Sequence, residues 1–374
     1  MLETRNLTDC SSGQNLTEPP LDTAGCLFLS ILPYGQAVPA LVCGFVLFTL
    51  FSFLVNLLTL LAVWWSEELS WQPRFTLVKN LILSDLMQIT TFGPAVIHSL
   101  VQRRTMPFRT WCYVQYFIGS TSIFTSLLTI TCMALERYLF VCRAIHYLVI
   151  LTEACLRRVL TLIWMFSIAV GVVTMALLHT GGAQSSGSVT MGLLCEPDMM
   201  EQHMGFPRSS AIFRKVVGTV TLLLCLMVFF FSYCRMYQDA RNAVIPFNAD
   251  NNKARKTVLL DCGMFLMQLL PLLLKVVSDA LWEVRGNAAM TGRSSQAGDV
   301  CTVKPAPTAT AAVLHVSLLM MLMVPPCINP MQYGLRNAEV RQALRRLIHR
   351  VTEEVADVAE RVGDGAHQNR AQEA

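Results

Sequence analysis

Seven long apolar runs divide the chain, and shorter polar segments separate them. Each run is about as long as, or longer than, the roughly 20 residues that an α-helix needs to cross about 30 Å of hydrocarbon. None has the period-two alternation of a barrel strand, and lipid requires backbone groups to be paired within the spanning segment. The pattern therefore predicts an all-α protein, a bundle of seven transmembrane helices. The predicted spans are residues 37–65, 80–101, 110–135, 159–178, 216–234, 257–274 and 306–333.

A different pattern follows the last span. Apolar residues recur there at helical spacing on one face, with arginines mostly elsewhere, which predicts an amphipathic helix on the inner membrane surface. The apolar positions are Val340, Leu344, Leu347, Ile348 and Val351. The chain thus divides into an extracellular N-terminus (1–36), a seven-helix membrane domain (37–335), the surface helix with a cytoplasmic extension (336–362) and a disordered tail (363–374).

The distribution of charge predicts the orientation. Basic residues such as Arg157, Arg158 and Arg255 concentrate in the segments that seven crossings assign to the cytoplasm, as the positive-inside rule requires. Two glycosylation sequons, at Asn6 and Asn15, lie in the N-terminal segment and agree with this orientation. We therefore expect a multi-pass protein of the plasma membrane, with a glycosylated N-terminus outside and the C-terminus inside.

Composition excludes several other classes of protein. Hydrophobic residues make up 53% of the 374 positions and charged residues only 14%, with a mean hydropathy of +0.48. A soluble domain normally carries about 25% charged residues, so the composition argues against a soluble enzyme. The net charge of +4 comes without a compact basic block interleaved with aromatics, which argues against nucleic-acid binding. No cofactor is expected.

Among the ionisable residues inside or next to the predicted spans, the informative ones are Asp85, Glu136, Arg137 and Asp261. Charge is costly there and usually faces the bundle interior or a wet cavity. Glu136-Arg137-Tyr138 sets a guanidinium beside a carboxylate at the membrane boundary, where it can form a salt bridge or meet a cytosolic partner. This tripeptide is either a switch or an ordinary charged helix end.

Cys112 lies at the opposite end of the same predicted helix. Arg137 follows it by 25 residues, about 37 Å of α-helix, so Cys112 reaches the outer rim when Arg137 is at the inner face. From there Cys112 can pair with Cys195, between the fourth and fifth spans, in an oxidising compartment. Three further cysteines are external, and the sequence does not decide which of them pair: Cys10, Cys26 and Cys301.

Short motifs across the membrane region carry a resemblance to a known family. They are Asn56 in the first span, Leu81 and Asp85 in the second, Cys112 and Glu136-Arg137-Tyr138 in the third, Trp164 in the fourth, and Asn329-Pro330-Met331-Gln332-Tyr333 at the end of the seventh. Together, in these spans and this order, they resemble the rhodopsin-like G protein-coupled receptors.

Longer stretches are similar to one branch of that family, the odorant receptors, particularly the fish type. They are residues 133–138, Ser232-Tyr233, residues 253–257 and residues 330–340. Leu269 stands where most relatives outside the odorant branch have a Trp, which also suits an odorant receptor. Two features depart from the pattern: the second outer loop has only Cys195, and the third outer loop is unusually long.

The resemblance implies a ligand pocket in the outer half of the bundle. Its residues would be Tyr116, Gly119, Ser120, Ile123, Leu269, Leu272, Leu319 and Met323. The first four share one face of the third helix, a spacing that core packing also explains. Amine receptors have an Asp at the position of Gly119, and opsins bind retinal through a Lys at the position of Met323. The implied ligand is a small, largely uncharged odorant, oriented by Ser120 or Tyr116.

The resemblance also implies how a signal would cross the membrane. Ligand binding would favour a state in which the sixth helix swings outward and Arg137 meets a G protein of the stimulatory olfactory type. Asp261 is expected to restrain the inactive state, while Asp85, Ser126 and Asn329 form a polar core and a candidate sodium site. The residues assigned to coupling and activation are Glu136, Arg137, Tyr138, Tyr233, Asp261, Asn329, Pro330 and Tyr333.

Two other interpretations stay open. A seven-helix transporter or pump also needs charges within the membrane, but the last span has no Lys and the chain shows no repeated halves. The other interpretation keeps the receptor fold but makes the chain a non-odorant orphan receptor, or a surface protein with little signalling left. The partners that we expect are an odorant-like small molecule, a heterotrimeric G protein and membrane lipid, and not nucleic acid.

Overall fold

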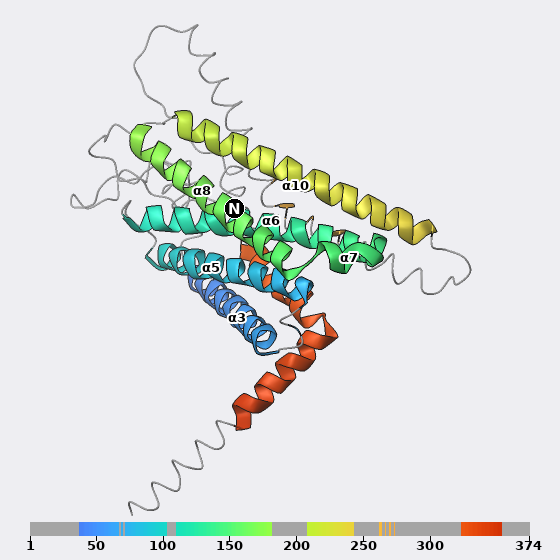
Figure 1. Ribbon diagram of the computed structural model, residues 1–374. Coiled ribbons are helices and arrows are strands. Elements are labelled where there is room, and N and C mark those ends of the chain that lie inside the picture. Colours follow the sequence, from blue (N-terminus) through green and yellow to red (C-terminus); the bar gives the residue numbers. More distant parts are fainter. Residues whose placement is uncertain are drawn as a thin grey trace, which may run out of the picture.

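The computed structural model describes residues 37–66, 69, 72–102, 110–181, 208–242, 262–263, 266, 269–270, 273 and 323–353 (Figure 1). These residues form helices, and no strand occurs in the described ranges. The long helices are α3 (Ala37–Trp65), α5 (Pro73–Gln102), α6 (Thr110–Cys142), α8 (Glu153–Gly181) and α10 (Arg208–Asn242). A short helix, α7 (Ala144–Ile150), links α6 to α8. The all-α fold class that the apolar pattern predicts is confirmed.

The last described segment contains two helices joined by a π-helical turn. Residues 323–329 are α-helical and lead into η1 (Pro330–Leu335), and residues 338–353 form the final helix. The seventh predicted span is therefore described only from residue 323 onward. Of the sixth predicted span, 257–274, the structure describes six helical positions.

The helices extend beyond the predicted spans. The first prediction matches α3 at both ends, but α5 begins at Pro73 instead of residue 80, and α6 continues to Cys142 instead of ending at 135. An apolar run marks only the part of a helix that lies in hydrocarbon, whereas backbone hydrogen bonding continues into the polar boundary. Four of the long helices are apolar and long enough to cross a membrane: α3, α6, α8 and α10.

α5 is less apolar because it carries its polar side chains on a buried face. Asn80, Ser84, Asp85, Gln88 and Thr91 are all buried within the bundle. By contrast α3, α8 and α10 expose large apolar side chains, for example Leu50, Leu162 and Met227. Polar groups inside and apolar groups outside are the distribution expected of a protein surrounded by lipid.

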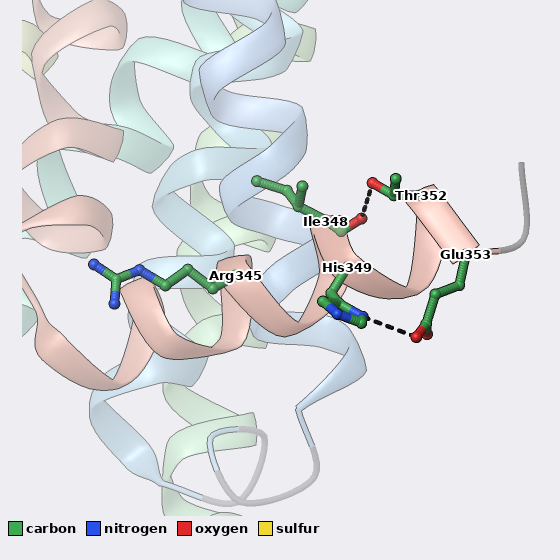
Figure 2. Close-up of a pocket in the computed structure, with 5 residues that line it drawn as sticks. All are labelled: Arg345, Ile348, His349, Thr352 and Glu353. Atoms are coloured by element: carbon green, nitrogen blue, oxygen red, sulfur yellow. Dashed lines mark hydrogen bonds and ion pairs between the residues drawn. The ribbon is translucent and has the colours of Figure 1, made fainter. Parts of the chain in front are cut away.

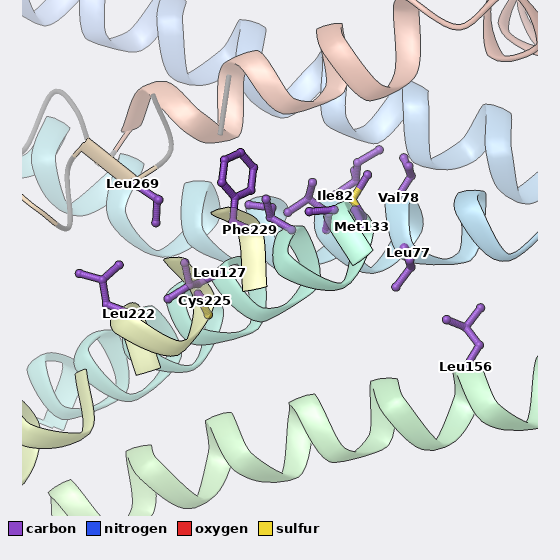
Figure 3. Packing of buried hydrophobic residues seen from close by; sticks show 13 residues of the cluster. Leu77, Val78, Ile82, Leu127, Met133, Leu156, Leu222, Cys225, Phe229 and Leu269 are labelled. Carbon is purple, nitrogen blue, oxygen red and sulfur yellow. The ribbon is translucent and has the colours of Figure 1, made fainter. Parts of the chain in front are cut away.

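α6 lies in the middle of the described bundle (Figure 1). It packs against α5 on one side and against α8 and α10 on the other, and α3 packs on the far side of α5. The largest core cluster joins these helices (Figure 3). It includes Leu77 and Ile82 of α5, Leu127 of α6, Phe229 of α10 and Leu269. α6 therefore packs against three of the other four long helices, namely α5, α8 and α10.

The final helix folds back against the start of the bundle. Val340, Ala343 and Leu347 are buried against a group from α3, α5 and the turn between them, formed by Ala62, Val63, Leu69 and Phe75. Ile348 and Val351, which the sequence places on the same apolar face, are 51% and 44% exposed. The predicted helix is present, but only part of its apolar face packs against protein.

Candidate functional site

A buried polar network connects α5, α6 and the segment before η1. Asn329 Nδ2 donates to Asp85 Oδ2 at 2.8 Å, and Ser126 also hydrogen-bonds the Asp85 carboxylate. The hydroxyl oxygens of Ser84 and Ser126 lie 2.8 Å apart, and either can donate. A carboxylate that is only 1% exposed requires such partners, because an unpaired charge is costly in the interior. The structure thus brings together Asp85, Ser126 and Asn329.

Asn56 joins α3 to the same segment. Its Nδ2 donates to the backbone oxygen of Ser52 at 2.8 Å and to that of Pro326 at 2.7 Å. Pro330 has no N–H, so position 330 cannot donate to the carbonyl four residues earlier, which is that of Pro326. The Asn56 amide supplies the missing donor. The seventh helix is therefore fixed to the first at the point where its own hydrogen bonding is interrupted.

A second polar contact ties α5 to α6 and α8. Asn80 Nδ2 donates to Thr129 Oγ1, and Trp164 Nε1 donates to Asn80 Oδ1, both at 2.8 Å. Both atoms of the buried Asn80 amide are thus paired, as a buried amide requires. The sequence analysis named Trp164 but missed Asn80 and Thr129. An Asn at the start of an apolar run was the signal that could have identified this position.

At the end of the bundle that is predicted to be cytoplasmic, Glu136 is buried and paired with a residue that the sequence motifs do not include. Tyr147 Oη, from α7, donates to Glu136 Oε1 at 2.8 Å. Arg74 of α5 and Arg137 both lie within electrostatic reach of this carboxylate. Burial first, and then the hydrogen bond to Glu136, raise the pKa of Tyr147 well above its ordinary value. The phenol therefore stays protonated and keeps donating over the physiological range of pH.

Two tyrosines assigned to coupling face α10 or lie on it. The ring of Tyr138 meets Phe231 edge-on, with centroids 5.6 Å apart, and the ring of Tyr233 lies 4.2 Å from that of Phe229. Arg137, which directly precedes Tyr138, is half-buried and has interactions of its own. These residues thus come from three elements, α6, α7 and α10.

In the half that is predicted to face outward, the structure brings together three of the predicted pocket residues, Gly119, Ile123 and Met323. Met323 is buried in an apolar cluster with Phe45 of α3 and Phe92 of α5, and Ile123 of α6 packs against it. We refer to this group as the outer apolar cluster; its buried members are Phe45, Phe92, Ala95, Val96 and Met323. A Cβ atom at Gly119 would collide with the ring of Phe92. The lack of a side chain at position 119 is therefore what lets Phe92 fill the space between α5 and α6.

The remaining described pocket residues are placed differently. Tyr116 is buried, and the hydroxyl of Ser120 donates to the backbone oxygen of Phe117 at 3.1 Å, on its own helix. Leu269 lies in the largest core cluster, near Leu222 and Phe229, and not in the outer apolar cluster (Figure 3). The spacing of these residues in the sequence did not predict which of them lie in the outer apolar cluster and which lie in the largest core cluster.

A groove on the final helix is not part of this site (Figure 2). It is lined by Arg345, Ile348, His349, Thr352 and Glu353, all from two turns of one helix. His349 Nδ1 lies 3.1 Å from Glu353 Oε1, and Thr352 Oγ1 donates to the backbone oxygen of Ile348 at 2.8 Å. Because a single helix supplies every lining residue, the groove does not enclose a ligand.

Several predicted site residues lie outside the part of the chain that the structure describes. They are Asn6, Asn15, Cys10, Cys26, Cys195, Asp261, Leu272, Cys301 and Leu319. For Cys112 and Tyr333 the structure describes the helical backbone only. The predicted disulfide, the glycosylation sites and the role of Asp261 therefore stay predictions.

Comparison with known proteins gives a consistent result. Residues 55–333 match the family described as 7 transmembrane receptor (rhodopsin family). Olfactory receptor 14A16 of Homo sapiens is 25% identical over 286 residues, which cover 74% of this chain and 80% of that protein. Olfactory receptor 7D4 of Homo sapiens is 26% identical over 342 residues, covering 90% and 97%. Melanopsin of Homo sapiens is 25% identical over 289 residues, covering 73% and 54%.

Proposed function

The chain belongs to the rhodopsin family of 7 transmembrane receptors, and on that premise we propose that it is an odorant receptor. It is a multi-pass membrane receptor and not an enzyme. In our proposal it binds a small, largely uncharged organic molecule in its outer half and activates a heterotrimeric G protein at its inner end. Similarity to several olfactory receptors over most of the chain supports this choice.

The observation that carries the proposal is the packing of Phe92 against Gly119. It leaves no room at position 119 for the acidic side chain with which amine receptors hold a cation. Met323, at the position of the retinal-binding Lys of opsins, is buried among apolar side chains. The wall that these residues form suits an apolar, uncharged ligand.

For the inner end, we propose that ligand binding shifts the population toward a state that exposes Arg137 to the G protein. The bond between Tyr147 and Glu136 supports this idea, since it holds α7 against α6 beside Arg137. Tyr138 and Tyr233 contact aromatic rings of α10, so a movement of α10 or of the sixth helix would change their surroundings. Coupling to the stimulatory olfactory type of G protein and restraint by Asp261 are parts of the same proposal.

The network around Asp85 is the proposed sodium site. It offers a carboxylate, the hydroxyl of Ser126 and the amide oxygen of Asn329, which are the hard oxygen donors that alkali and alkaline-earth cations prefer. These residues therefore fit a sodium ion. When bound, the ion would supply positive charge to the carboxylate, and Asn329 would continue to donate from Nδ2.

The topology that we propose has the N-terminus outside, with glycans on Asn6 and Asn15 and a disulfide between Cys112 and Cys195. The excess of Arg and Lys in the predicted inner segments supports it. The final helix would rest on the inner leaflet. Its exposed apolar residues, Ile348 and Val351, and its exposed arginines suit contact with lipid and headgroups.

The test is a measurement of cyclic AMP in cells that express the full chain with the stimulatory olfactory-type G protein. The cells are challenged with mixtures of small odorants. We expect a concentration-dependent response that Arg137→Ala abolishes at equal surface expression. If the wild-type protein reaches the surface and no mixture raises cyclic AMP, the proposed function is wrong.

A separate variant tests the role of Asp261. If Asp261 restrains the inactive state, Asp261→Asn should raise basal cyclic AMP at unchanged surface expression. Unchanged basal cyclic AMP would remove Asp261 from the mechanism and leave the rest of the proposal in place.

A further inference from the structure

Gln115, on the outer half of α6, has an amide without a hydrogen-bond partner among the described residues. Its side chain is only 1% exposed, and neither its oxygen nor its nitrogen makes a hydrogen bond within the described part of the chain. A buried amide that lacks all its hydrogen bonds destabilises the folded protein, so such groups are rare unless water or a ligand completes them. The position was not among the pocket residues that the sequence predicts.

The register between α5 and α6 shows what Gln115 faces. The two helices run side by side in opposite directions (Figure 1). Three contacts fix their register: Asn80 bonds Thr129, Ser84 bonds Ser126, and Phe92 packs at Gly119. From one contact to the next, the residue number rises on α5 and falls on α6. Gln115 is one turn beyond Gly119 on the same face, which sets it opposite Ala95 and Val96.

Neither of these α5 residues can satisfy the amide. Ala95 and Val96 have apolar side chains and belong to the outer apolar cluster. Nearby hydroxyls on α6 are already used: Ser120 donates to the backbone of Phe117, and Ser122 donates to that of Gly119. The amide of Gln115 therefore offers one acceptor and two donors at the edge of an apolar surface.

We propose that the Gln115 carboxamide binds the polar head of the ligand whose apolar body packs on the outer apolar cluster. The head is an uncharged group that both donates and accepts a hydrogen bond, such as a primary amide, a hydroxyl or a neutral carboxylic acid. The ligand is uncharged because a carboxamide cannot neutralise an ion and the described members of the cluster are all apolar. The inference rests on the proposed ligand-sensing function and makes Gln115 its specificity-determining residue.

The test uses the purified full chain in detergent micelles and three eight-carbon probes: octanamide, 1-octanol and n-octane. Thermal unfolding is followed for the wild-type protein and for Gln115→Leu, with Ser122→Ala as the matched control. Ser122 is also buried on α6, but its hydroxyl bonds its own helix. A ligand that binds only the folded state raises the unfolding temperature.

We expect octanamide and octanol to raise the unfolding temperature of the wild-type and Ser122→Ala proteins more than octane does. In Gln115→Leu that preference should disappear, with affinity for octanamide falling roughly tenfold. Without ligand, Gln115→Leu should unfold at the same temperature as wild type or higher, because the substitution removes an unpaired buried group.

Three results would overturn the inference. One is an unchanged preference for octanamide in Gln115→Leu, and another is a wild-type protein that none of the probes stabilises. The third is a ligand-free Gln115→Leu protein that unfolds several degrees lower, because internal water would then satisfy the amide as part of the fold. Selective binding through Gln115 without any cyclic AMP response would keep this inference and reject the proposed function, so the two failures are distinguishable.

Discussion

Asn329 donates a 2.8 Å hydrogen bond to the carboxylate of Asp85, although 244 positions separate the two residues in the chain. Both side chains are buried, so neither has ready access to solvent as an alternative partner. The contact connects the helix before η1 to α5. It therefore couples the seventh span to the centre of the bundle through a group that is costly to leave unpaired.

Replacement of Asn329 by Ala should destabilise the protein, because the Asp85 carboxylate loses a donor that the interior does not replace. The expected loss in unfolding free energy is about 1–3 kcal/mol. Thermal unfolding of the purified protein measures it. The control is Thr90→Ala, which removes an exposed hydroxyl bonded to its own helix and should change stability by less than about 0.5 kcal/mol. Equal unfolding temperatures for the two variants would contradict the prediction.

Tyr147→Phe should destabilise the protein by an amount that depends on pH only in the alkaline range. The pKa of Tyr147 is raised by burial and by its bond to Glu136, so the protonated phenol is favoured in the folded state. Its stabilisation is fully present below the unfolded-state pKa, which is about 10, and is lost as the pH rises through the folded-state pKa.

The difference in unfolding temperature between wild type and Tyr147→Phe should therefore be constant from about pH 7 to pH 9 and shrink only above about pH 10. The same scan on Tyr237→Phe provides a control, since Tyr237 is an exposed residue of α10. A difference that already shrinks near neutral pH would show that the bond to Glu136 does not hold the phenol protonated.

Gly119→Ala should disturb the contact between α6 and α5, because the new methyl group meets the ring of Phe92. Overpacking of this kind costs about 1–3 kcal/mol. A smaller residue at position 92 should relieve it, so Gly119→Ala combined with Phe92→Leu should be less destabilised than the sum of the single variants. Additive losses in thermal unfolding would mean that the two positions do not compete for the same space.

Trp164→Phe should cost about 1 kcal/mol beyond the loss of contact area, because it removes the donor to Asn80 Oδ1 and leaves that acceptor unpaired. In an Asn80→Ala background the same substitution should cost less. A double-mutant cycle by thermal unfolding checks this, and a coupling energy near zero would show that the hydrogen bond does not contribute.

The sequence by itself determined the helical nature of the chain and the approximate position of its helices. The length and uniform polarity of an apolar run are local properties, and in lipid such a run can satisfy its backbone only as a helix. The same reasoning identified Asp85, Glu136 and Arg137, since the cost of a charge within a span does not depend on knowing its partner. The predicted ends of the helices were less accurate, because helices extend past the hydrocarbon. α6, for example, continues to Cys142.

Only the tertiary structure decided which polar groups meet. Tyr147 pairs with Glu136 because α7 folds back on α6, and nothing in the spacing of the two residues requires it. Gln115 finds no hydrogen-bond partner among the described residues, and nothing in the spacing of α6 predicts this. Such contacts depend on how each helix is rotated and shifted against its neighbours. Packing of the whole bundle sets that arrangement, whereas the hydrophobic pattern of one helix fixes only which of its faces is apolar.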